Sequence, residues 1–99
     1  MAKKTSRARG SEKISRSFRI QNELGLHARA AALFVKISSR FQSDILVRKG
    51  TTEVNGKSIM GILMLAAARG STVQVTARGR DAPEAIKELA TETYRDYNQ

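Results

Sequence analysis

The 99-residue sequence contains no cysteine and no tryptophan, and Pro83 is its only proline. Without cysteine the chain can form neither a disulfide framework nor a thiolate metal site, which fits a reducing compartment. Its one histidine and scattered acidic residues offer no set of metal ligands. We therefore expect a protein that uses no metal and no cofactor.

Long apolar runs are also absent from the sequence. No window approaches the ~18 uninterrupted apolar residues that a membrane span needs. The basic N-terminus is followed by no apolar segment, so it does not match a secretory signal. The sequence thus predicts a cytoplasmic protein that does not enter a membrane.

Acidic residues are scarce, because 18 Lys and Arg residues face 9 Asp and Glu residues and give a net charge of +9. More than half of this charge, +5, falls in residues 1–16. Residues 1–14 are polar without hydrophobic periodicity, so we expect a basic disordered tail that precedes a domain at 15–99. That domain is mildly basic, which suits acidic protein surfaces. Aromatic residues make up only 5% and are scattered, which makes a nucleic-acid partner a poor fit.

Hydrophobic periodicity predicts seven elements around one core. We expect strands at 15–20, around 45–47, at 51–54 and at 73–77. Helices are expected from Ala28 to about Arg40, from the N-cap Ser58 through Ala66 to a stop at Gly70, and from the N-cap Asp81 onward. The order is β-α-β-β-α-β-α. Strands and helices that each have one apolar side predict a two-layer α+β sandwich.

His27 is the only histidine, and it lies directly before the first predicted helix. The free N–H groups of a first helical turn and the positive end of the dipole favour an anion at this point. The forked guanidinium of Arg29 could pair with phosphoryl oxygens. A lone histidine is more often a surface or capping residue, so His27 alone leaves both interpretations open.

Two motifs favour the interpretation that His27 carries a phosphoryl group. The stretch from Gly25 to Ala31, GLHARAA, resembles the active-site signature of the HPr family, the small histidine-phosphorylated carriers of the bacterial phosphotransferase system. About thirty residues on, the stretch from Asn55 to Leu63, NGKSIMGIL, resembles the regulatory-serine segment of the same family. The resemblance covers roughly residues 15–94. It departs at Ala30, where the family usually has proline.

The resemblance implies an open-faced sandwich in which three helices cover one face of a four-stranded antiparallel sheet. It implies that His27 accepts a phosphoryl group from phosphoenolpyruvate through Enzyme I and passes it to EIIA-type proteins. Arg29 would stabilise the phosphate. Ser58 would be a regulatory site for a serine kinase, HPr kinase/phosphorylase.

The short helix after Ser58 has more apolar residues than one buried stripe can hold. We expect Ile62, Leu65 and Ala66 to face the core, while Met64 could lie in the core or outside it. The remaining apolar residues would then form a surface patch for partner docking, with Lys36 as a further contact. The docking residues predicted in this way are Ile59, Met60, Leu63 and Lys36.

The sequence shows no Walker loop, dinucleotide fingerprint or nucleophile elbow. We therefore expect a monomeric phosphoryl carrier with no turnover of its own. The alternative is a regulatory HPr-like binding protein, in a nitrogen-type branch of the system, that acts through its phosphorylation state.

Overall fold

The computed structural model describes residues 12–20, 27–65 and 70–97, of which 92–97 are described as main chain only. The elements are β1 (Lys13–Arg19), α2 (Ala28–Ser38), β2 (Asp44–Lys49), β3 (Thr52–Asn55), α3 (Ile59–Met64), β4 (Thr72–Arg78) and α4 (Ala82–Tyr97). This order confirms the predicted β-α-β-β-α-β-α sequence.

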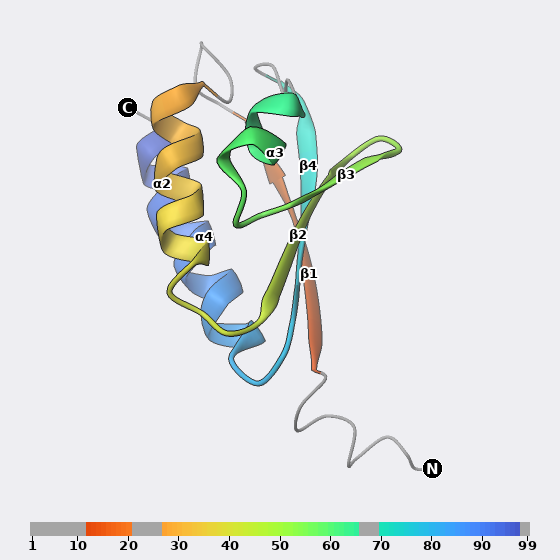
Figure 1. The fold of residues 1–99 in the computed structure, drawn as a ribbon, viewed down its shortest axis with the longest axis vertical. Helices are drawn as coiled ribbons and strands as arrows, with labels where there is room; N and C mark the ends of the chain where they lie inside the picture. Colours follow the sequence, from red (N-terminus) through yellow and green to blue (C-terminus); the bar gives the residue numbers. More distant parts are fainter. Residues whose placement is uncertain (1–11, 21–26, 66–69, 98–99) are drawn as a thin grey trace.

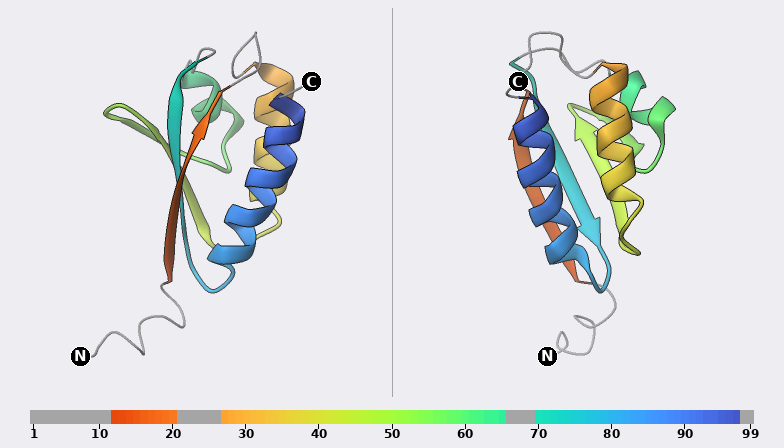
Figure 2. Two further views of the ribbon diagram at one scale, coloured as in Figure 1. Left: turned by 180° about the vertical axis from the view of Figure 1, so that it is seen from behind. Right: turned by 90° about the vertical axis from the view of Figure 1, so that its left-hand side faces the viewer.

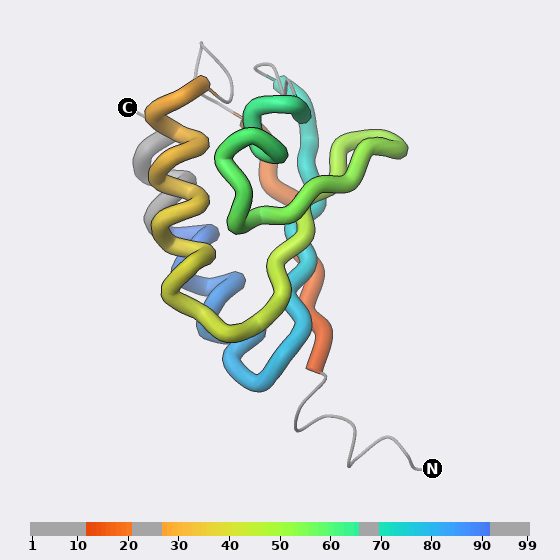
Figure 3. Tube along the Cα trace, in the orientation of Figure 1, coloured from red at the N-terminus to blue at the C-terminus, as the bar shows by residue number. Residues whose placement is uncertain are grey.

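The strands form one antiparallel sheet in the order β1-β4-β2-β3. The three helices of the described residues lie on one face of this sheet, and the other face is open (Figures 1 and 2). Helices α2 and α4 pack against each other, and α3 packs beside α2 near the end where α2 begins. The β2–β3 hairpin extends beyond the other strands (Figure 3). The predicted open-faced two-layer α+β sandwich is therefore confirmed.

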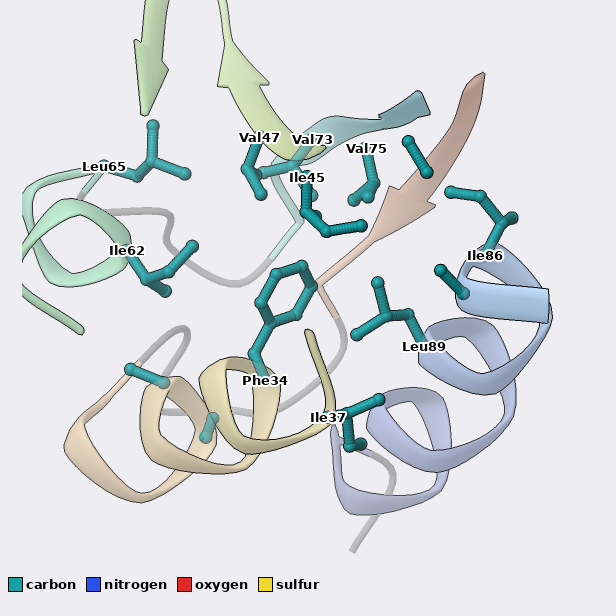
Figure 4. Packing of buried hydrophobic residues seen from close by; sticks show 14 of the residues in the cluster. Phe34, Ile37, Ile45, Val47, Ile62, Leu65, Val73, Val75, Ile86 and Leu89 are labelled. Atoms are coloured by element: carbon teal, nitrogen blue, oxygen red, sulfur yellow. The ribbon is translucent and has the colours of Figure 1, made fainter. Parts of the chain in front are cut away.

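The core lies between the sheet and the helices, because each strand turns alternate apolar residues to the same side. Phe34 of α2 points into the space between the two layers, toward the strand residues (Figure 4). Ile62 and Leu65 are both buried, as predicted, whereas Ala66 lies outside the described residues. The other large apolar core residues are Ile20, Ile37, Ile45, Val47, Val73, Val75, Ile86 and Leu89.

The first strand begins two residues before the predicted boundary. Lys13 pairs with Arg78 and Ile14 with Ala77, and the partly buried Ile14 packs against the core. One residue earlier, the carbonyl of Glu12 accepts a hydrogen bond of 2.8 Å from the Gly79 N–H. The tail predicted at 1–14 was therefore too long, since an apolar residue inside it completes the sheet. Residues 1–11 lie outside the described part of the chain.

Three other boundaries were predicted imperfectly. Helix α2 ends at Ser38 rather than near Arg40, because the N–H groups of Arg40 and Phe41 donate to carbonyls three residues back, as in a 3₁₀ turn. Strand β3 is shifted by one residue from the predicted range, 51–54. Gly70 was wrongly predicted to close α3. Its N–H donates to the carbonyl of Ile20, so it is tied to the end of β1.

Asp81 precedes α4 at the predicted N-cap position, but its carboxylate bonds elsewhere. It accepts hydrogen bonds from the Gln42 N–H at 2.9 Å, the Ser43 N–H at 3.0 Å and the Ser43 hydroxyl at 2.5 Å. The hydrogen bond from the Ser43 hydroxyl lowers the pKa of Asp81 most strongly, and the two main-chain bonds lower it further. Partial burial raises the pKa, but the net shift is downward. Asp81 thereby ties the start of α4 to the loop between α2 and β2.

Gly79 makes this close approach possible. A side-chain Cβ at Gly79 would lie 2.8 Å from the Ser43 Cα, and its φ of +148° disfavours other residues. The Asp81 bonds and the Gly79 contact together form what we call the Asp81 tie.

Among the described residues, no helix is both long enough and apolar enough to cross a membrane.

Candidate functional site

His27 lies directly before α2, as the sequence predicts, and it is the N-cap of this helix. Its backbone is extended (φ −104°, ψ −178°), and its carbonyl accepts the Ala31 N–H at 2.8 Å. The imidazole turns back over the helix end, where Nδ1 accepts the Arg29 N–H at 3.3 Å. Because an acceptor needs a free lone pair, Nδ1 is the unprotonated nitrogen in this arrangement. The lone pair of a nucleophile thus lies beside the donors of the first helical turn.

The charge around this helix end favours an anion. The first turn of α2 contains no acidic residue, so within that turn no carboxylate offsets the positive end of the helix dipole. Arg29 is exposed, and its guanidinium has no ion-pair partner among the described residues. His27 itself is partly exposed, so a partner protein can reach it. Gly25, the first residue of the motif, lies outside the described residues.

Ser58 is the N-cap of α3, which confirms the cap predicted at this residue. Its hydroxyl accepts the Gly61 N–H at 3.0 Å. The turn before it is held by two bonds of Lys57, whose N–H donates to Asn55 Oδ1 at 2.8 Å and whose Nζ donates to the Phe41 carbonyl at 2.7 Å. The serine is thus presented by a fixed turn at the start of the helix that lies beside α2.

Helix α3 presents exposed apolar side chains, but they differ from the predicted set. Ile59 is 44% exposed and Met60 is 66% exposed, as expected of a surface patch. Leu63 is partly buried and packs against the core, because α3 sits close enough to α2 and the sheet to cover it. Met64 instead is 70% exposed. We call Ile59, Met60 and Met64 the α3 patch.

Lys36 is exposed on the last turn of α2, whereas His27 lies at the first. At 1.5 Å per residue, this places them roughly 13 Å apart along the helix axis.

Within the described ranges, no group of three or more His, Cys, Asp or Glu residues could hold a metal ion. Sequence reasoning missed the bond from Lys57 Nζ to Phe41, since nothing in the local pattern indicates which distant carbonyl an ammonium will reach.

Comparison with known proteins gives one consistent result. Residues 14–92 match the family model described as "PTS HPr component phosphorylation site". The chain is 46% identical over 76 residues to the phosphocarrier protein HPr of Neisseria meningitidis serogroup A, covering 77% of this chain and 85% of that protein. It is 42% identical over 77 residues to the HPr-like protein Crh of Bacillus subtilis, covering 78% and 91%.

A solved structure agrees with these sequence matches. HPr from Thermoanaerobacter tengcongensis superposes with a TM-score of 0.82 at 43% identity, and the match covers 87% of this chain and 97% of that one. Fold and site together define the class of small phosphocarrier proteins. The chain belongs to the HPr family, and its role is that of a phosphocarrier of the phosphotransferase system, with Enzyme I and EIIA proteins as its general partners.

Proposed function

We propose that His27 accepts a phosphoryl group from phosphoenolpyruvate through Enzyme I and passes it to EIIA-type proteins. The observation that carries this proposal is the position of Nδ1, whose lone pair accepts the Arg29 N–H and so lies beside the N–H groups at the start of α2. Family membership supports the reaction class, and His27 is the only imidazole in the chain.

In the proposed step, the Nδ1 lone pair attacks the phosphorus carried by Enzyme I. A nitrogen–phosphorus bond forms, while the bond to the donor breaks and its electron pair stays on the donor atom. Backbone N–H groups at the helix end and the Arg29 guanidinium offset the charge on the phosphoryl oxygens. A nucleophile of EIIA then attacks the same phosphorus. The nitrogen–phosphorus bond breaks, and its electron pair returns to Nδ1. It supplies a nucleophile and a docking surface, and it completes no turnover alone.

The test is reconstitution with Enzyme I and phosphoenolpyruvate, followed by intact mass and peptide mapping. We expect one acid-labile phosphoryl group on His27, which purified EIIA then removes. A control without Enzyme I should leave the mass unchanged. Labelling on another residue, or no labelling at all, would contradict the proposal.

A regulatory HPr-like function is the second candidate, because Crh, the catabolite repression HPr of Bacillus subtilis, is 42% identical to this chain. In that case Enzyme I would still label His27, but EIIA would remove the group slowly or not at all. Transfer to EIIA therefore separates the two functions. The monomeric state and the cytoplasmic location stay predictions.

We propose that the α3 patch is a docking surface shared by Enzyme I and EIIA. A Met60→Glu variant should weaken binding of both by ~2 kcal/mol or more, about thirtyfold in Kd, since it places a charge in a buried apolar contact. Isothermal titration calorimetry would measure this. Leu46→Glu is the matched control, because Leu46 is 38% exposed on the open face of the sheet. If Met60→Glu and Leu46→Glu weaken binding equally, the α3 patch is not the docking surface.

We propose that Ser58 is a regulatory phosphorylation site. A phosphate there would be tolerated at the N-terminus of α3, but it would add roughly two negative charges beside Ile59 and Met60. Ser58→Asp should therefore slow transfer from Enzyme I to His27 at limiting Enzyme I, without loss of thermal stability, because Asp is also a good N-cap.

Ser58→Ala provides the control for this prediction. It removes the cap and should cost ~1 kcal/mol of stability, while the transfer rate stays that of the wild type. If Ser58→Asp accepts the phosphoryl group from Enzyme I at the wild-type rate, Ser58 is a helix cap only.

A further inference from the structure

The third residue of α2, Ala30, carries a backbone donor directed at the same helix end as the His27 imidazole. With His27 as N-cap, Arg29 occupies the second helical position and Ala30 the third. An N-cap side chain typically accepts from the N–H of the second or the third position. His27 Nδ1 uses the second, at 3.3 Å. Outside the helix, the third N–H, that of Ala30, donates to no main-chain acceptor among the described residues.

The position of this donor is fixed by packing. Ala30 is fully buried, and its side chain belongs to the hydrophobic core between α2 and the sheet. The next residue, Ala31, is also fully buried, and its N–H donates to the His27 carbonyl. The main chain at residue 30 is therefore held in place by packing before any ligand arrives.

A group bonded to Nδ1 would lie over these amides. When a phosphorus atom takes the Nδ1 lone pair, the Arg29 N–H loses its present acceptor, and three phosphoryl oxygens take its place. Two adjacent N–H groups, those of Arg29 and Ala30, are then available to these oxygens. We propose that the Ala30 N–H donates a hydrogen bond to the phosphoryl group on His27, as a binding residue of the phosphorylated state. This inference rests on the proposed function.

The expected consequence concerns the phosphoryl equilibrium. A donor to the charged oxygens stabilises the phosphorylated form and does nothing for the free imidazole. Proline at this position would lack the N–H, so it would remove one donor and leave the first helical turn intact. In a mixture with Enzyme I, the phosphoryl group should reside on this chain more often than on its Ala30→Pro variant.

The test measures the equilibrium constant for phosphoryl exchange with Enzyme I, by intact mass at several ratios of the two proteins. Ala30→Pro should shift the constant about tenfold toward phosphorylated Enzyme I, the size expected for one hydrogen bond to a charged group. Ala30→Gly is the matched control, since it changes the side chain at the same position but keeps the N–H. It should stay within about twofold of the wild type.

A second measurement needs no variant. In ¹⁵N-labelled wild-type protein, phosphorylation should move the Ala30 amide proton downfield and slow its exchange with water, whereas the Ala32 amide, further along the helix, serves as the reference. If His27 is phosphorylated, yet the Ala30 amide is unmoved and Ala30→Pro keeps the wild-type equilibrium, this inference is wrong and the carrier function stands. If wild-type His27 is never phosphorylated, the carrier function itself fails.

Discussion

A His27→Ala variant is expected to acquire no acid-labile phosphoryl group from Enzyme I and phosphoenolpyruvate, however long the incubation. The chain has no other imidazole that could take over the role. Intact mass spectrometry after exhaustive incubation would show the difference directly. The loss should be complete rather than partial, because the substitution removes the attacking atom and not a group that assists it.

A structural control is needed because His27 also caps α2. The bond from the Arg29 N–H to Nδ1 disappears in His27→Ala, at a cost of ~1 kcal/mol. Asparagine is a good N-cap without a nucleophilic ring nitrogen, so His27→Asn should keep the stability and lose the phosphorylation. Labelling of His27→Asn at the wild-type level would refute the carrier function.

A large loss of stability is expected when the Asp81 tie is removed. Asp81→Ala removes three hydrogen bonds to a charged acceptor and leaves the buried Ser43 hydroxyl without its partner. We expect the free energy of unfolding to fall by about 3 kcal/mol, the upper range for hydrogen bonds to a charged group. Urea unfolding followed by circular dichroism would measure it. Asp44→Ala is the control, since Asp44 is exposed at the start of β2. Similar losses in both variants would contradict a special role for Asp81.

The same tie predicts how stability depends on pH. Its hydrogen bonds lower the pKa of Asp81 in the folded protein below the ordinary value. The folded state then binds a proton less readily than the unfolded state, so the contribution is fully present above about pH 4 and is lost as the pH falls through the folded pKa. Asp81→Ala should lack this component. The difference in unfolding free energy between wild type and variant should therefore shrink on acidification.

Local patterns predicted the elements of this fold well, because each depends on nearby residues. Ser58 caps α3 through a hydroxyl that bonds three residues on, and Ile62 and Leu65 face the core by helical periodicity. The position of His27 was predictable for the same reason. A cap is a local feature, and the motif around it carried the resemblance to the family.

Features that depend on tertiary contacts were not predictable. The Asp81 carboxylate bonds to Gln42 and Ser43, which are 39 and 38 residues away, rather than to its own helix. Leu63 and Met64 are neighbours on a helix of only six residues, so periodicity could not tell which one the rest of the protein covers. In the structure Leu63 is partly buried against the core, whereas Met64 is exposed.

Strand β1 lies at one edge of the sheet and, among the described strands, pairs with β4 alone, so its outer N–H and C=O groups could pair with another chain. Lys13, Arg16 and Arg19 place an exposed positive charge at every third residue along this edge. Cationic side chains on an edge strand discourage pairing between identical copies, which would bring like charges together. Salt screens that repulsion. The protection against aggregation at this edge is thus electrostatic, and it weakens as ionic strength rises.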